Sequence, residues 1–249
     1  MPIKTPIVAL FAVCLIVSCK KNNGTGSNGN PNKLKQYIEQ YQFLTTNTSD
    51  TFQVSYDNQN RLTGLSSPLV RLAYTYTSAT SFTLDLFQYG QLAIHEVGYV
   101  NSASYIDSSF QYNNTNDSTT QKFIYSGSLL TRQKTYSYSH LASIVSAQDD
   151  YTYDNNGNMT KDVNSDGVGD VNYITAFTYT DHPLNVTINP TYYPPQSKNL
   201  PATQKVTDSG GNSYANITYA YVFDSAGRLT KETETADDGE IFIKIYVYN

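Results

Sequence analysis

Residues 70–77 of the chain read Val-Arg-Leu-Ala-Tyr-Thr-Tyr-Thr. Large side chains at Val70, Leu72, Tyr74 and Tyr76 alternate with smaller or more polar ones. A period of two residues places successive side chains on opposite faces of an extended strand. This stretch therefore predicts a β-strand in a sheet that turns one face toward the core.

The same alternation recurs along most of the chain, for example at residues 82–86, 171–179 and 241–248. These segments are rich in Tyr, Thr, Val, Ile and Phe, the residues that fit a pleated sheet. Clusters of Asn, Asp, Gly and Ser separate them and indicate turns. Residues 34–44 also fit a helical period, but no Ser, Thr or Asp cap precedes them, so we expect a strand there too. The body of the protein is predicted to be all-β.

The composition excludes several classes of protein. The chain has 249 residues, of which 39% are hydrophobic and 15% charged, with 23 Tyr and two Cys. Collagen, coiled coils and disulfide scaffolds have other compositions. The formal net charge is -5, and the longest basic run is the pair Lys20 and Lys21. We therefore expect no nucleic-acid partner.

The first 18 residues have the layout of a secretory signal. Lys4 precedes the apolar run 7–17, which is shorter than the roughly 20 residues of a membrane span. Ile-Val-Ser-Cys at 16–19 then resembles the lipobox of bacterial lipoproteins. That resemblance implies that Cys19 is the first mature residue, carries acyl chains and anchors the protein in a membrane.

Residues 19–32 form the predicted tether between the anchor and a single domain at 33–249. After Cys19 the tether contains no apolar residue, so we expect it to be flexible. The residue after the cysteine is Lys20. Inner-membrane lipoproteins of Gram-negative bacteria carry Asp there, so the lipoprotein resemblance implies the outer membrane, on either face. The domain has 13 basic and 21 acidic residues.

A short unit recurs within the domain: an aromatic residue, Asp, a turn with Gly or Asn, then Leu or Met and Thr. It occurs at 56–63, 153–160 and 223–230, with weaker copies at 89, 125 and 179. The Asp accepts backbone hydrogen bonds, Gly or Asn supplies positive φ, and the flanking side chains pair across a hairpin. The unit is therefore predicted to nucleate hairpins.

These units resemble the YD repeat of the RHS proteins, whose members build β-sheet shells. The overall layout is similar to a set of uncharacterised bacterial lipoprotein domains with a porin-like, curled antiparallel sheet. We expect an antiparallel meander of roughly 10–14 strands, and because open twisted sheets of more than about ten strands rarely stay flat, it should curl into a half-barrel or open barrel. A membrane-spanning barrel is disfavoured, because the alternate faces carry Thr, Tyr, Asn and Lys rather than a lipid-facing band of Leu and Val.

One segment has the order of oxygen atoms that begins a calcium loop. The ligands would be the side chains of Asp162, Asn164, Asp166 and Asp170 and the carbonyl of Val168. Position 12 is Tyr173, where an EF-hand has a bidentate Glu. Two interpretations stay open: a weak Ca²⁺ site between two strands, or a solvated hairpin turn. Ca²⁺ is the only cofactor that the sequence suggests.

Catalytic signals are sparse, and we expect no enzyme. His95, His140 and His182 lie in separate segments without metal-binding spacing. The acidic pairs Asp149–Asp150 and Asp237–Asp238 are predicted to lie in turns, which would not hold two carboxyl groups on a rigid floor.

The most favoured function is a non-catalytic binding or structural role in the cell envelope. Tyrosines on exposed sheet faces offer flat apolar surfaces with a hydroxyl group for glycan or polymer contact. The candidates are Tyr136, Tyr138, Tyr192 and Tyr193. The alternative is a periplasmic carrier that holds a lipid or apolar ligand in the concave sheet. An enzyme acting on envelope or extracellular polymer ranks third.

Overall fold

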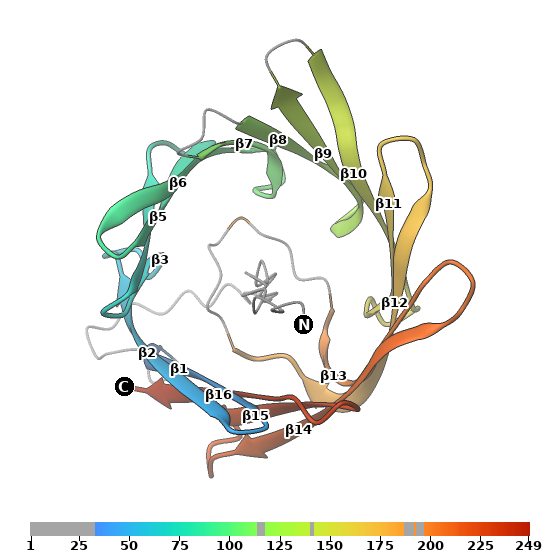
Figure 1. Cartoon of the computed structure of the whole chain (residues 1–249). Helices are drawn as coiled ribbons and strands as arrows, with labels where there is room; N and C mark the ends of the chain where they lie inside the picture. The colour runs from blue at the N-terminus through green and yellow to red at the C-terminus, as the bar shows by residue number, and fades with distance from the viewer. Residues whose placement is uncertain (1–32, 114–117, 140–141, 187–191, 193–196) are drawn as a thin grey trace, which may run out of the picture.

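The computed structural model describes residues 33–113, 118–139, 142–186, 192 and 197–249. These residues form 16 antiparallel strands that close into a barrel (Figure 1). No described residue belongs to a helix with the length and hydropathy of a membrane span. The strands are β1 Leu34–Phe43, β2 Thr46–Tyr56, β3 Leu62–Ser66, β4 Val70–Tyr76, β5 Ser81–Gln88, β6 Gln91–Val100, β7 Ile106–Asn113, β8 Ser118–Ser126, β9 Leu129–Ser139, β10 Ala142–Tyr153, β11 Met159–Asp166, β12 Val171–Pro183, β13 Asn199–Thr207, β14 Ser213–Phe223, β15 Leu229–Ala236 and β16 Ile241–Tyr248.

The predicted all-β antiparallel meander is confirmed, including the strand at residues 34–43. The predicted open sheet of roughly 10–14 strands is wrong, because β1 pairs with β16 and closes the ring. In this ladder Tyr37 lies opposite Tyr246, and Tyr41 lies opposite Phe242. Closure satisfies the backbone groups that two free edges would expose. The turns alternate between two rims. One of them, called the terminal rim here, holds the first described residue and the C-terminus, where the Asn249 N–H donates to the Lys33 carbonyl at 3.0 Å.

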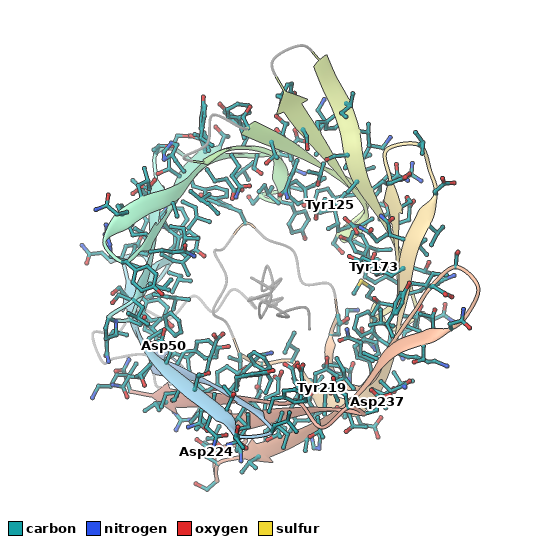
Figure 2. The ribbon with its side chains drawn as sticks, in the orientation of Figure 1. Asp50, Tyr125, Tyr173, Tyr219, Asp224 and Asp237 are labelled. Carbon is teal, nitrogen blue, oxygen red and sulfur yellow. The ribbon has the colours of Figure 1, made fainter. Side chains whose placement is uncertain are left out.

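The two faces of the wall differ in chemistry. Side chains of Tyr125, Tyr173 and Tyr219 point into the ring (Figure 2). The ladder registers place further tyrosines on this inward face: Tyr37, Tyr41, Tyr74, Tyr151, Tyr221 and Tyr246. The outward positions of β2 and β15 are all polar, whereas β16 turns isoleucines outward. Thus the interior is the more aromatic side of this barrel.

Two apolar clusters line the interior near the terminal rim. The first joins β1–β4 to β13–β16, and the second joins β4–β10. Val186 and Tyr192, both from the β12–β13 connection, are buried in the first and second cluster respectively. The Tyr192 ring lies 5.6 Å from the rings of Tyr76 and Phe82, on strands opposite β12 in the ring (Figure 1). Side chains of this connection therefore contribute to the core on both sides of the barrel.

Aspartate-centred turns join strands at the terminal rim. Asp154 Oδ1 accepts the N–H groups of Asn156 and Asn158 at 2.9 and 2.8 Å. Asp57 and Asp224 do the same at 57–61 and 224–228. In the turn centred on Asp154, Gly157 has a φ of 84°, a conformation that favours glycine. The hydrogen bonds from the turn backbone lower the pKa of Asp154.

A tyrosine clamp repeats around the same rim. We define it as a tyrosine at the end of one strand whose hydroxyl donates to a backbone carbonyl near the start of the preceding strand. Tyr153 at the end of β10 donates to the carbonyl of Leu130, near the start of β9, at 2.7 Å. The equivalent bonds from other even-numbered strands join Tyr76 to Leu62, Tyr125 to Ile106, Tyr179 to Met159, Tyr221 to Pro201 and Tyr248 to Leu229. Each clamp satisfies a carbonyl where the ladder becomes irregular.

Candidate functional site

An exposed aromatic patch lies on the outward face of β7 and β9. It consists of Phe110 and Tyr112 on β7 and Tyr136 and Tyr138 on β9. Tyr112 is 51% exposed and Tyr138 is 38% exposed. Single exposed apolar side chains occur elsewhere on the barrel, but here four aromatic residues are contiguous, and a contiguous exposed patch marks a candidate interaction site.

Strand register fixes the layout of the patch. Ser118 on β8 lies between Tyr112 and Tyr138, and Thr120 lies between Phe110 and Tyr136. The backbones of β7 and β9 lie two strands apart, or roughly 10 Å. The two small side chains on β8 let the ring of Phe110 approach that of Tyr138 above them, so the patch is a continuous aromatic surface.

Ring contacts hold the patch in place. Phe110 and Tyr112 meet edge to face with centroids 4.5 Å apart, and Phe110 lies 6.3 Å from Tyr138. His95 of β6 lies 6.2 Å from Tyr112. Its Nδ1 is 2.6 Å from Asp85 Oδ1, which orients the imidazole. The rings are therefore positioned before any ligand binds.

The structure separates the four tyrosines chosen from the sequence. Tyr136 and Tyr138 lie together on the outward face, two residues apart on β9. Tyr192 is 7% exposed and belongs to the interior cluster. Tyr193 falls outside the described residues. Sequence reasoning missed Phe110 and Tyr112, although their alternation with Gln111 is a signal that could have found them.

The predicted calcium ligands do not converge. Asp162, Asn164 and Asp166 point to one face of the extended strand β11, so their side chains are spaced about 7 Å apart. Asp166 Oδ1 instead accepts the N–H groups of Val168 and Asp170 in the following turn. Among the described residues, no three His, Cys, Asp or Glu side chains are grouped to hold a metal ion. The calcium site stays a prediction, with the hairpin turn as its observed local structure.

Acidic groups gather on the inward face of β10 and β11. Burial raises the pKa of Asp149 and, together with the nearby charges of Asp149 and Asp150, raises the pKa of Asp162 to about 7. Asn164 Nδ2 donates to Asp149 Oδ1 at 2.6 Å. Asp162 Oδ1 is buried and has no hydrogen-bond partner among the described residues. Burial and the nearby carboxylates therefore favour the protonated form of Asp162.

The acidic pair Asp149–Asp150 lies in β10, so its prediction as a turn is wrong. Alternation along the strand sends Asp149 inward, whereas Asp150 pairs with Arg132 on the outward face. The two carboxylates therefore cannot act on one substrate. The pair Asp237–Asp238 does lie in a turn. His182 packs against Phe223, and His140 is outside the described residues.

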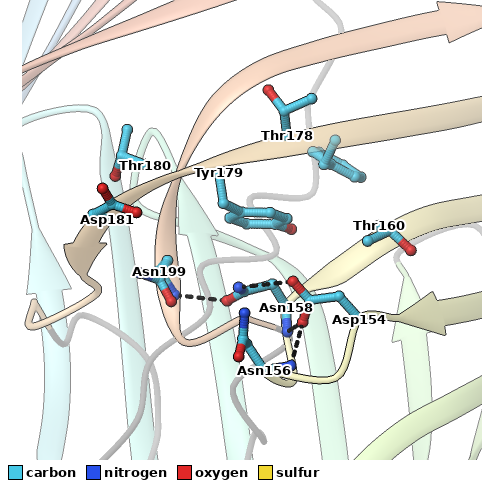
Figure 3. Close-up of a pocket in the computed structure, with 10 residues that line it drawn as sticks. Asp154, Asn156, Asn158, Thr160, Thr178, Tyr179, Thr180, Asp181 and Asn199 are labelled. Atoms are coloured by element: carbon cyan, nitrogen blue, oxygen red, sulfur yellow. Dashed lines mark hydrogen bonds between the residues drawn. The ribbon is translucent and has the colours of Figure 1, made fainter.

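A polar pocket of about 260 Å³ lies at the terminal rim (Figure 3). β11 and β12 are paired in the described ladder from Ser165 to Lys161 and not closer to the rim. The pocket lies between the two strands at their unpaired ends. Asn158 Oδ1 accepts the N–H groups of Lys198 and Asn199 there, and its amide donates to Asp154. Because these groups already bond to one another, the pocket has a structural role in joining the hairpin turn to β13.

Comparison with solved structures identifies the architecture. A porin-like protein from Bacteroides uniformis matches with a TM-score of 0.65 and 12% identity over 88% of this chain and 98% of that one. The fold is that of a porin-like barrel. A second porin-like protein, from Bacteroides vulgatus, has a TM-score of 0.62 and 11% identity, covering 87% of this chain and 98% of that one. No family model and no curated protein matches the sequence.

These findings overturn the family resemblance drawn from the hairpin units. The assignment to YD-repeat proteins of the RHS group, and to curled-sheet lipoprotein domains built from such hairpins, is wrong. The similar structures are porin-like, and the sheet closes completely. Aspartate turns of this kind arise wherever antiparallel strands need a tight connection, so their recurrence does not identify a family.

Proposed function

We propose that the chain is a lipid-anchored protein of the outer membrane that binds a polysaccharide through the aromatic patch and is not an enzyme. The observation that carries this proposal is the exposure of Tyr112 and Tyr138 on either side of Ser118. Tyr rings stack on the apolar faces of sugars, and their hydroxyl groups reach sugar hydroxyls.

Two features support an anchored barrel that lies outside the bilayer. A membrane barrel needs an outward apolar band about 25 Å tall. Here the outward positions include Lys161 on β11, Lys205 on β13 and Lys231 on β15, at sites within the ladders. The lipobox-like sequence at 16–19 would supply the membrane attachment instead.

The experiment measures binding of the full-length chain, purified in detergent, to a panel of envelope and extracellular polysaccharides. The double variant Tyr112→Ala/Tyr138→Ala should weaken binding at least about tenfold, since an aromatic stacking contact contributes roughly 1 kcal/mol. Tyr214→Ala is the matched control, because Tyr214 is 65% exposed on β14 and lies away from the patch. Equal losses in the two variants, or no polysaccharide binding by the parent chain, would contradict the proposal.

A second candidate, the carrier of a lipid or apolar ligand, is favoured by the interior near the terminal rim. Val54 and Leu72, which are only partly buried, pack there against the fully buried leucines of the first cluster. Extraction of the purified chain with organic solvent, followed by mass spectrometry, should recover stoichiometric lipid if this candidate is right. Recovery of detergent alone would leave the polysaccharide-binding role as the supported one.

A further inference from the structure

Next to the aromatic patch, the barrel wall is positively charged, although the domain as a whole is acidic. Residues 118–148 contain no Asp or Glu. Within this stretch Lys122 on β8 and both Arg132 and Lys134 on β9 point outward. The whole chain has 21 acidic and 16 basic residues, so this basic segment is a local reversal of charge.

The two lysines lie directly opposite each other in the ladder between β8 and β9. Like charges in this position destabilise a sheet. Arg132 is neutralised by Asp150, but neither lysine forms an ion pair with another described residue. The two lysines repel each other and have no counter-ion within the described part of the chain. An anionic ligand bound between them would supply that counter-ion.

The basic pair is continuous with the aromatic patch. Lys134 is two residues from Tyr136 on β9, and Lys122 Nζ on β8 stands 6.0 Å from the centre of the Tyr136 ring. A ligand that stacks on the rings therefore passes over the ammonium groups. Such a ligand must combine sugar rings with regularly placed anionic groups, which is the chemistry of an acidic polysaccharide.

We propose that the outward face of β7–β9 binds an acidic polysaccharide, with sugar rings on the aromatic patch and carboxylate groups at Lys122 and Lys134. This inference rests on the proposed function and adds the charge class of its ligand. Binding should weaken as salt rises, because both lysines are near the solvent and their attraction to the ligand is screened.

The test compares two probes with the same sugar backbone: polygalacturonate, whose carboxylates are charged, and its fully methyl-esterified form, which is neutral. The full-length chain in detergent should bind polygalacturonate at least about tenfold more tightly at low salt, with about a fivefold gain expected per lysine. Lys122→Gln/Lys134→Gln should remove that preference and leave binding to the methyl ester unchanged. The matched control is Lys161→Gln/Lys205→Gln, which removes two exposed outward lysines that flank Ala176 elsewhere on the wall.

Each result separates the two proposals. Equal binding of both probes, with loss in Tyr112→Ala/Tyr138→Ala, would overturn the acidic-ligand inference and leave the polysaccharide-binding function standing. Equal effects of the two lysine pairs would also overturn the inference, because only net charge would then matter. If neither probe binds and vesicles containing anionic phospholipid do, the face recognises lipid headgroups and both proposals fail.

Discussion

Lys244 shows how single residues shape the interior of this barrel. Its Nζ donates to Glu232 Oε1 at 2.9 Å and also to Glu234. Burial alone would lower the pKa of Lys244, but the two carboxylates raise it above its usual value. Burial raises the pKa of Glu232. One ammonium group thus holds two acidic side chains on the inward face.

Replacing this lysine should be strongly destabilising. In Lys244→Met the two glutamates would face each other without a counter-charge, and loss of one member of a buried ion pair costs about 3–5 kcal/mol. Urea unfolding followed by tyrosine fluorescence would measure the change. Lys231→Met on the outward face of β15 serves as control and should change the free energy of unfolding little; a similar small effect at Lys244 would refute the role given to it.

Asp162 should make stability depend on pH. Its pKa is raised to about 7 in the folded chain, above its ordinary value of 3.8. The folded state therefore binds the proton more tightly, and stability falls as pH rises from about 4 to about 7. Asp162→Asn cannot ionise, so it should raise the melting temperature at pH 8 and leave it nearly unchanged at pH 4.

The exposed Asp181 provides the comparison for that measurement. Asp181→Asn should leave the pH profile of the melting temperature as it is in the parent chain. If the melting temperature of Asp162→Asn also follows the same pH dependence as the parent chain, the pKa of Asp162 is not raised in the folded barrel and the prediction is wrong.

At the scale of an element, the repeating piece is a strand pair locked by a tyrosine clamp. The clamp joins the end of an even-numbered strand to the start of the strand before it, for example Tyr248 to Leu229. The clamp residues are 14 to 23 positions apart, so each bond links the two ends of one hairpin. The aspartate turn then leads into the next hairpin.

Removing one clamp hydroxyl should have a modest, measurable cost. Tyr153→Phe keeps the ring and leaves the Leu130 carbonyl without its 2.7 Å hydrogen bond. A loss of about 0.5–1.5 kcal/mol in the free energy of unfolding is expected. Tyr214→Phe, at an exposed position, should lose nothing. If the two variants unfold at the same urea concentration, the clamp does not stabilise the barrel.

Local sequence patterns predicted the strands and the aspartate turns, because alternation and turn chemistry act within a few residues. The recurring unit at 153–160 is the predicted hairpin turn, here between β10 and β11. Its sequence did not reveal the tyrosine clamps on either side of it. The pair Asp149–Asp150 was read as a turn because two adjacent acids look solvated. In the structure its neighbours Gln133 and Asn164 place it within a sheet.

At the scale of the whole molecule, closure joins residues 34–42 to residues 241–248. No local signal in either segment specifies a partner some 200 positions away, so the sequence predicted curvature without a closed ring. The aromatic patch likewise depends on which strands pair, and local sequence patterns do not specify this. Tyr136 and Tyr138 were visible as a pair, but only the ladders through β8 bring Phe110 and Tyr112 alongside them.

The cellular position of the barrel follows from the polysaccharide-binding proposal. With an epitope tag after Asn249, protease treatment of intact cells should remove the tag signal, because an extracellular ligand requires the barrel on the outer face. A tagged periplasmic protein should stay intact in the same cells. Protection of the barrel until the outer membrane is permeabilised would instead favour the lipid carrier.

The meeting of Lys33 and Asn249 at one rim has a topological consequence. The ladder between β1 and β16 is one among 16 similar ladders, so the place where the chain begins is arbitrary for the ring. A short peptide linking these two residues would allow new ends to be opened at the glycine turn 209–211, on the opposite rim. With residues 1–32 moved to the new N-terminus at that turn, the lipid attachment proposed at Cys19 would join the barrel at the opposite rim.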